Sequence, residues 1–74
     1  MYRVMSRVHN SEEFCLGEYD DYLDALDAMW VNLNIARTIG QHIEPNRVGG
    51  GFFLLKARVV IENIYILEIS EVNA

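Results

Sequence analysis

The stretch Glu18–Leu33, EYDDYLDALDAMWVNL, decides the fold, because a helical spacing of apolar residues begins in it. Apolar side chains recur every three or four residues, at Leu23, Leu26, Trp30 and Leu33. This period predicts one amphipathic helix from Asp20 to about Ile39. Either Asp20 or Asp21 can cap the first turn, where negative charge is favoured. The acidic residues are therefore interpreted as a helix start and a solvated face, not as a metal site.

Two strands are expected before this helix. Tyr2–Val8 alternates between two sides, the pattern of a half-buried strand, with Arg3, Met5 and Arg7 on one of them. The segment Phe14–Glu18, FCLGE, follows a polar turn and is expected to complete a hairpin, with Phe14 and Leu16 buried.

Two more strands are expected after the helix. Residues 41–51 contain Pro45 and end in three glycines, so they are predicted to form a flexible loop. The following stretch, FFLLKARVVIENIYILEIS, predicts two strands joined by a three-residue turn at 61–63, a register that pairs Lys56 with Glu68. We therefore expect a single domain over residues 1–74, an α+β fold of two layers. An antiparallel sheet of three to four strands, in the chain order β-β-α-β-β, would carry one long helix on one face.

The small size of the chain makes self-association attractive. A chain of 74 residues buries only about 60% of its unfolded surface, and a single cysteine cannot form an internal disulfide. In the expected register the sheet face away from the helix is apolar. Its members are Met5, Phe52, Leu54, Val60, Ile64 and Ile66. A smaller apolar patch, Val31 and Ile35, interrupts the polar side of the helix. We expect a homodimer through one of these two patches, and the choice between them stays open.

Charge allows two further interpretations. The net charge is −5, but four cations are expected on the same sheet face as Phe52. They are Arg3, Arg7, Lys56 and Arg58. A basic sheet with an aromatic side chain is typical of some single-strand RNA binders, so nucleic-acid binding is the alternative. The acidic residues between Glu12 and Asp27 allow a second alternative, an inhibitor that mimics phosphate on a nucleic-acid-binding protein.

No motif in the chain predicts chemistry. Nothing in the spacing of Cys15, His9 and His42 brings them together, and they are too few for the usual zinc sites. We therefore expect no catalytic residue, cofactor or metal, and predict a non-enzymatic protein-interaction module, a self-associating accessory or regulatory subunit whose protein partner stays open. The first residues contain no long apolar stretch, so no secretion signal or membrane span is expected, and one unpaired cysteine favours the cytoplasm.

Overall fold

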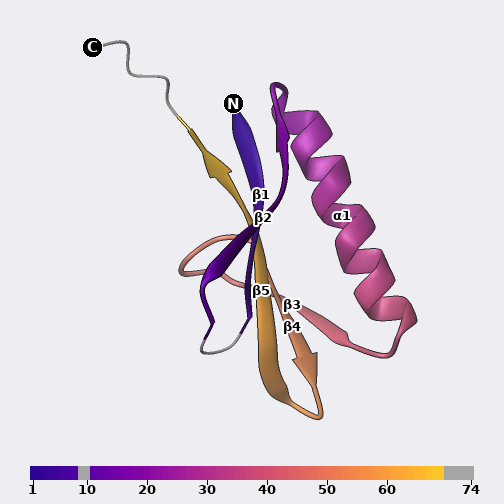
Figure 1. The fold of residues 1–74 in the computed structure, drawn as a ribbon. Helices are drawn as coiled ribbons and strands as arrows, with labels where there is room; N and C mark the ends of the chain where they lie inside the picture. The colour runs from indigo at the N-terminus through magenta and orange to yellow at the C-terminus, as the bar shows by residue number, and fades with distance from the viewer. Residues whose placement is uncertain (9–10, 70–74) are drawn as a thin grey trace.

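The computed structural model describes residues 1–8 and 11–69 and shows an α+β fold of two layers (Figure 1). Helix α1 (Tyr22–Thr38) lies across one face of an antiparallel sheet. The five strands of the sheet are β1 (Tyr2–Val8), β2 (Glu13–Tyr19), β3 (His42–Pro45), β4 (Phe52–Lys56) and β5 (Val59–Glu68). They lie in the order β2-β1-β5-β4-β3, so β2 and β3 are the edge strands. The α+β class and the chain order are confirmed, but the sheet has one strand more than expected.

The additional strand is β3, which lies inside the predicted loop. Residues 42–45 pair with β4, and Pro45 lies opposite Phe52. An edge strand tolerates proline because one side of its backbone needs no hydrogen-bond partner. The prediction of a loop was therefore wrong for residues 42–45.

The turn between β4 and β5 also differs from the prediction. The chain reverses at Ala57 and Arg58, whose φ values are 52° and 67°, and Lys56 pairs with Val59. Two left-handed residues form the primed type of hairpin turn, which matches the twist of the strands. The predicted turn at 61–63 and its pairing of Lys56 with Glu68 were therefore wrong, because these three residues lie inside β5.

This register places most of the predicted open face beneath the helix. Leu54 and Ile64 are buried in the core, and Phe52 and Ile66 pack against it. Both rows of side chains on these strands are apolar, so alternation could not say which row meets α1. Met5 and Val60 do lie on the helix-free face; Met5 is nevertheless buried there.

The buried stripe of α1 is rotated from the predicted one. It consists of Ala25, Met29, Leu33 and Ala36. Leu33 was predicted correctly, but Leu23 is 63% exposed. Trp30 leans toward β4, where its ring centroid lies 5.0 Å from that of Phe52. At the start of α1, Asp21 rather than Asp20 is the cap and accepts a hydrogen bond from the Leu23 amide at 3.1 Å.

Candidate protein-interaction surface

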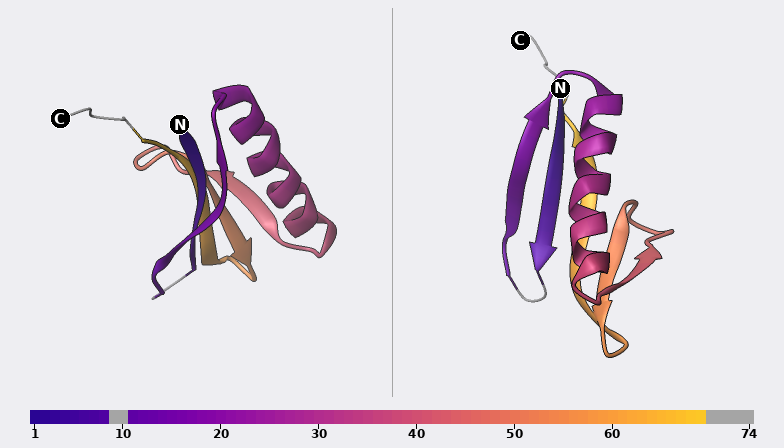
Figure 2. Two further views of the ribbon diagram at one scale, coloured as in Figure 1. Left: turned by 45° about the horizontal axis from the view of Figure 1, so that its top comes forward. Right: turned by 90° about the vertical axis from the view of Figure 1, so that its right-hand side faces the viewer.

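Helix α1 is too narrow to cover its side of the sheet. Five strands span roughly 19 Å between the outer two, and a helix with its side chains is about 10 Å wide. In the right-hand view of Figure 2, β1 and β2 stand beside α1, and the end where their hairpin turns is not covered by it. Burial agrees with this picture. Tyr2 and Tyr19 pack against the core at the covered end, whereas Val8 and Phe14 are exposed at the other end.

One side of helix α1 carries exposed apolar residues. We call Val31, Ile35 and Ile39 the α1 flank; they are 58%, 58% and 69% exposed. At 100° per residue, Ile35 lies about 140° around the helix from Trp30, which packs toward β4. Ile35 therefore lies on the side of α1 away from β4, whereas Val31, about 160° around the helix from the buried Met29, points away from the sheet.

A hollow of about 190 Å³ lies beside Ile35 and Ile39 of the α1 flank, between the helix and the strands β4 and β5. Glu62 lines the hollow and accepts a hydrogen bond from the buried Ser6 hydroxyl. Phe14 on the edge strand β2 is 54% exposed; it pairs with Ser6, and Ser6 pairs with the core residue Ile64, so all three lie on the helix side. The prediction that Phe14 and Leu16 are buried was wrong, because both are exposed on the edge strand β2.

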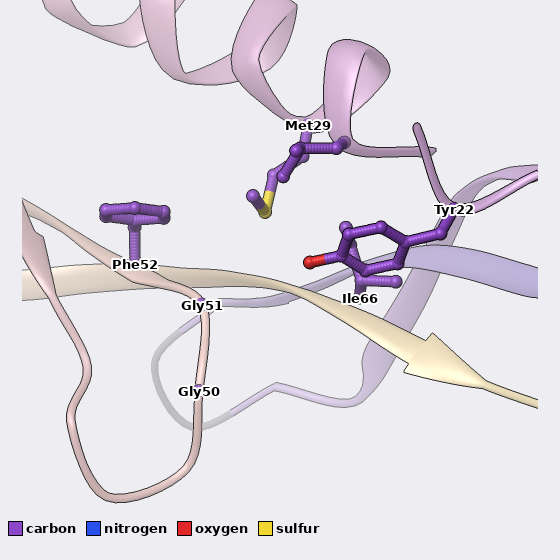
Figure 3. Close-up of a pocket in the computed structure, with 7 residues that line it drawn as sticks. Tyr22, Met29, Gly50, Gly51, Phe52 and Ile66 are labelled. Atoms are coloured by element: carbon purple, nitrogen blue, oxygen red, sulfur yellow. The ribbon is translucent and has the colours of Figure 1, made fainter. Parts of the chain in front are cut away.

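A second apolar hollow lies on the opposite side of α1 (Figure 3). Met29 points from the helix into the space between Phe52 and Tyr22, and Ile66 lies below Tyr22. The hollow has a volume of about 320 Å³, at the low end of the range for small-molecule sites.

The helix-free face carries paired charges. Arg3 Nε lies 3.1 Å from Glu18 Oε1, and Arg7 pairs with Glu13. Arg3, Met5 and Arg7 lie on one side of β1, as the alternation predicted. Because carboxylates accompany Arg3 and Arg7, this face is less basic than the sequence indicated.

The other two predicted cations lie near the β4–β5 turn. Arg58 lines a hollow of about 540 Å³ together with His42, Glu44 and Leu55. Lys56 pairs with Val59 at the same turn. The predicted combination of a basic face with Phe52 is therefore not formed, because Phe52 lies on the helix side.

Tyr65 and Glu13 are neighbours on the helix-free face. The Tyr65 hydroxyl and the Arg7 guanidinium beside Glu13 lower the pKa of this carboxyl. Burial, and then the neighbouring Glu13 carboxylate, raises the pKa of Tyr65 to about 12. Both shifts move away from neutral pH, whereas a general acid or base works best with a pKa near it. The geometry is that of a structural contact. Nearby, Asn63 Oδ1 is buried without a hydrogen-bond partner in the described part of the chain.

The residues considered for chemistry are not brought together. Cys15 is exposed on β2 and His42 lies on β3, at opposite edges of the sheet. His9 lies outside the described residues. In residues 1–8 and 11–69, no three side chains of the metal-binding types are close enough to hold an ion. Across the same ranges, α1 falls short of the length and hydropathy needed to cross a membrane.

Comparisons of the chain with protein-family models, with curated proteins and with solved structures find no match in any of the three.

Proposed function

We propose that this chain is a non-enzymatic protein-interaction module that associates with itself and serves as an accessory or regulatory subunit. One observation carries the proposal: the apolar side chains of the α1 flank and of Phe14 are each more than half exposed. Soluble monomers rarely keep a contiguous apolar patch of this kind in water.

The free energy available from this surface is large for a small domain. The exposed parts of Phe14 and the α1 flank come to roughly 400 Å² per copy, given about 150 to 200 Å² for a fully exposed large apolar side chain. Burial in two copies contributes roughly 20 kcal/mol. Association costs on the order of 4 to 15 kcal/mol. Side-chain ordering and desolvation of polar groups add to this cost, so the area is sufficient for a dimer but does not set its affinity.

Of the two predicted interface patches, the structure supports the smaller one. The first patch loses its basis because Phe52, Leu54, Ile64 and Ile66 lie under α1. Val31 and Ile35 are each 58% exposed on α1. Nucleic-acid binding has less support, because Arg3 and Arg7 are paired with carboxylates. We retain the cytoplasm as the proposed location, since an unpaired cysteine suits a reducing compartment.

Sedimentation velocity combined with an oligonucleotide titration tests the proposal. At tens of micromolar protein the expected result is a dimer, and a labelled single strand at low salt should not bind. A monomer over this range would contradict self-association. Binding of the oligonucleotide that weakens steeply with salt would favour the nucleic-acid alternative instead.

A further inference from the structure

We propose that a polar hollow on the helix-free face binds a neutral carboxamide group. The hollow has a volume of about 290 Å³, near the lower end of the range for small-molecule sites. Its walls come from β1, β2 and β5 and from the connection between β3 and β4. The residues that line it are Arg7, Glu13, Asn46, Gly49, Asn63 and Tyr65. This site is separate from the α1 flank, so the inference does not depend on self-association.

One polar atom of the lining lacks a hydrogen-bond partner. Asn63 Oδ1 is buried and accepts no hydrogen bond from any residue that the structure describes. A buried oxygen without a donor costs free energy, and such an atom in a native structure calls for an explanation. Because Asn63 lines the hollow, a molecule bound there can supply the missing donor.

Strand pairing brings the other polar groups to the same place. Arg7 pairs with Asn63 on β5 and with Glu13 on β2. Tyr65 follows Asn63 by two residues, so both side chains point to the same side of the sheet. Figure 1 shows that the connection between β3 and β4 also lies on this side, away from α1. The strands therefore form the floor of the hollow, and the connection forms a wall.

Asn46 holds this wall in shape. Its Oδ1 accepts hydrogen bonds from the amides of Val48 and Gly49, at 3.2 Å and 3.1 Å. Its backbone amide donates to the Gly51 carbonyl oxygen at 2.9 Å. Because Oδ1 is used within the connection, the group that Asn46 offers to the hollow is its Nδ2 donor.

The charges around the hollow favour a neutral ligand. Arg7 pairs with Glu13, so the lining carries one positive and one negative charge. The Tyr65 hydroxyl and the Arg7 guanidinium lower the pKa of Glu13, so this carboxylate stays ionised at neutral pH. A carboxylate ligand would be repelled by Glu13 and would have no proton to donate to Asn63. An ammonium ligand would face the guanidinium of Arg7.

A carboxamide meets these requirements without a charge. Its N–H group can donate to Asn63 Oδ1. Its carbonyl oxygen can accept from Asn46 Nδ2 or from the Arg7 guanidinium, which has five N–H donors and uses Nη2 for Glu13. Two sources provide this group: a free small amide, and the side chain of asparagine or glutamine in a partner protein.

Titration with acetamide tests the proposal. Acetate and methylammonium are the controls, because they are of similar size but carry a charge. In heteronuclear NMR spectra of the isotope-labelled chain, millimolar acetamide should shift the side-chain amide signals of Asn63 and Asn46 in a saturable way. The two controls should leave these signals unchanged. If acetamide shifts neither signal, or if acetate shifts them equally, the proposal is wrong and water is the partner of Asn63 Oδ1.

The variant Asn63→Leu separates binding from folding. Leucine has a similar size but no polar atom, so acetamide binding followed at Asn46 should weaken by at least about tenfold. The unfolding midpoint should stay equal or rise, because an unpaired buried oxygen is removed. Asn34→Leu is the control, because Asn34 is exposed on α1, and it should bind acetamide as the wild type does. Unchanged binding by Asn63→Leu, or a marked loss of its stability, would overturn the proposal.

A short capped peptide with one glutamine distinguishes the two sources of the carboxamide. If the peptide competes with acetamide and its glutamate counterpart does not, the ligand is a protein side chain. If acetamide binds and neither peptide competes, the ligand is a free small amide. Neither result changes the expected oligomeric state, so the proposed self-association stands or falls separately.

Discussion

At the scale of the residue, Gly51 is where the connection from β3 passes closest to β5. Its φ is +77°, and an added Cβ would lie 2.6 Å from Tyr65 Cβ and also press on the Ile64 carbonyl oxygen. Gly50 has a similar φ of +80° but open space around it. The two positions therefore separate backbone strain from a steric clash.

We expect Gly51→Ala to lower the free energy of unfolding by about 3 kcal/mol, because strain and overpacking add. Gly50→Ala should cost only about 1 kcal/mol, the strain alone. Urea denaturation of both variants measures the difference. Equal losses would mean that the chain does not pass this close to β5.

Tyr65 gives a prediction about pH. Its pKa in the folded chain is about 12, above the ordinary value of 10.0. The folded chain thus holds this proton more tightly than the unfolded chain, so the contribution to stability is complete below pH 10.0 and is lost as the pH rises toward 12. Replacing Glu13→Gln should lower the Tyr65 pKa, as followed by phenolate absorbance. The control Glu18→Gln, which alters the pair with Arg3, should leave it unchanged. An unchanged titration in Glu13→Gln would refute the pairing.

At the scale of the element, the sequence predicts where strands and the helix form better than it predicts how the strands β4 and β5 pair. The first strand was predicted with its observed bounds and sidedness, and the helix to within two residues at its start. The β4–β5 turn was missed because Ala57 and Arg58 are not turn residues, whereas Asn63 is a good one. For the proposed interface, the sequence indicated Val31 and Ile35, because they are apolar residues on the polar side of the helix. The sequence did not indicate Phe14, because its exposure depends on how far α1 extends over β1 and β2.

The turn itself can be tested by sequence change. Replacing Ala57→Asn and Arg58→Gly together should stabilise the protein by about 1 to 2 kcal/mol, because asparagine and glycine favour the left-handed conformations observed there. Asn63→Gly serves as the contrast. It should destabilise by about 1 kcal/mol if Asn63 lies inside β5, and thermal unfolding distinguishes the signs. If Asn63→Gly stabilised the protein, this result would support the turn at 61–63 that the sequence predicted.

At the scale of the whole molecule, one helix and five strands do not match in width. The helix covers the end of the sheet that carries Tyr2 and Tyr19, and the twist of the sheet carries the hairpin of β1 and β2 away from it (Figure 1). Exposed apolar side chains therefore remain on the helix side, at Phe14 and the α1 flank, and also on the opposite face, at Val60 and Leu67. We propose that a second molecule covers the α1 flank.

Sedimentation equilibrium of the wild-type chain beside the double variant Val31→Glu and Ile35→Glu tests this most directly. Val48→Glu is the control, because Val48 is fully exposed in the loop between β3 and β4. We expect the wild-type and control chains to be dimers at tens of micromolar and the double variant to be a folded monomer. A double variant that remains as dimeric as the wild type would contradict the account.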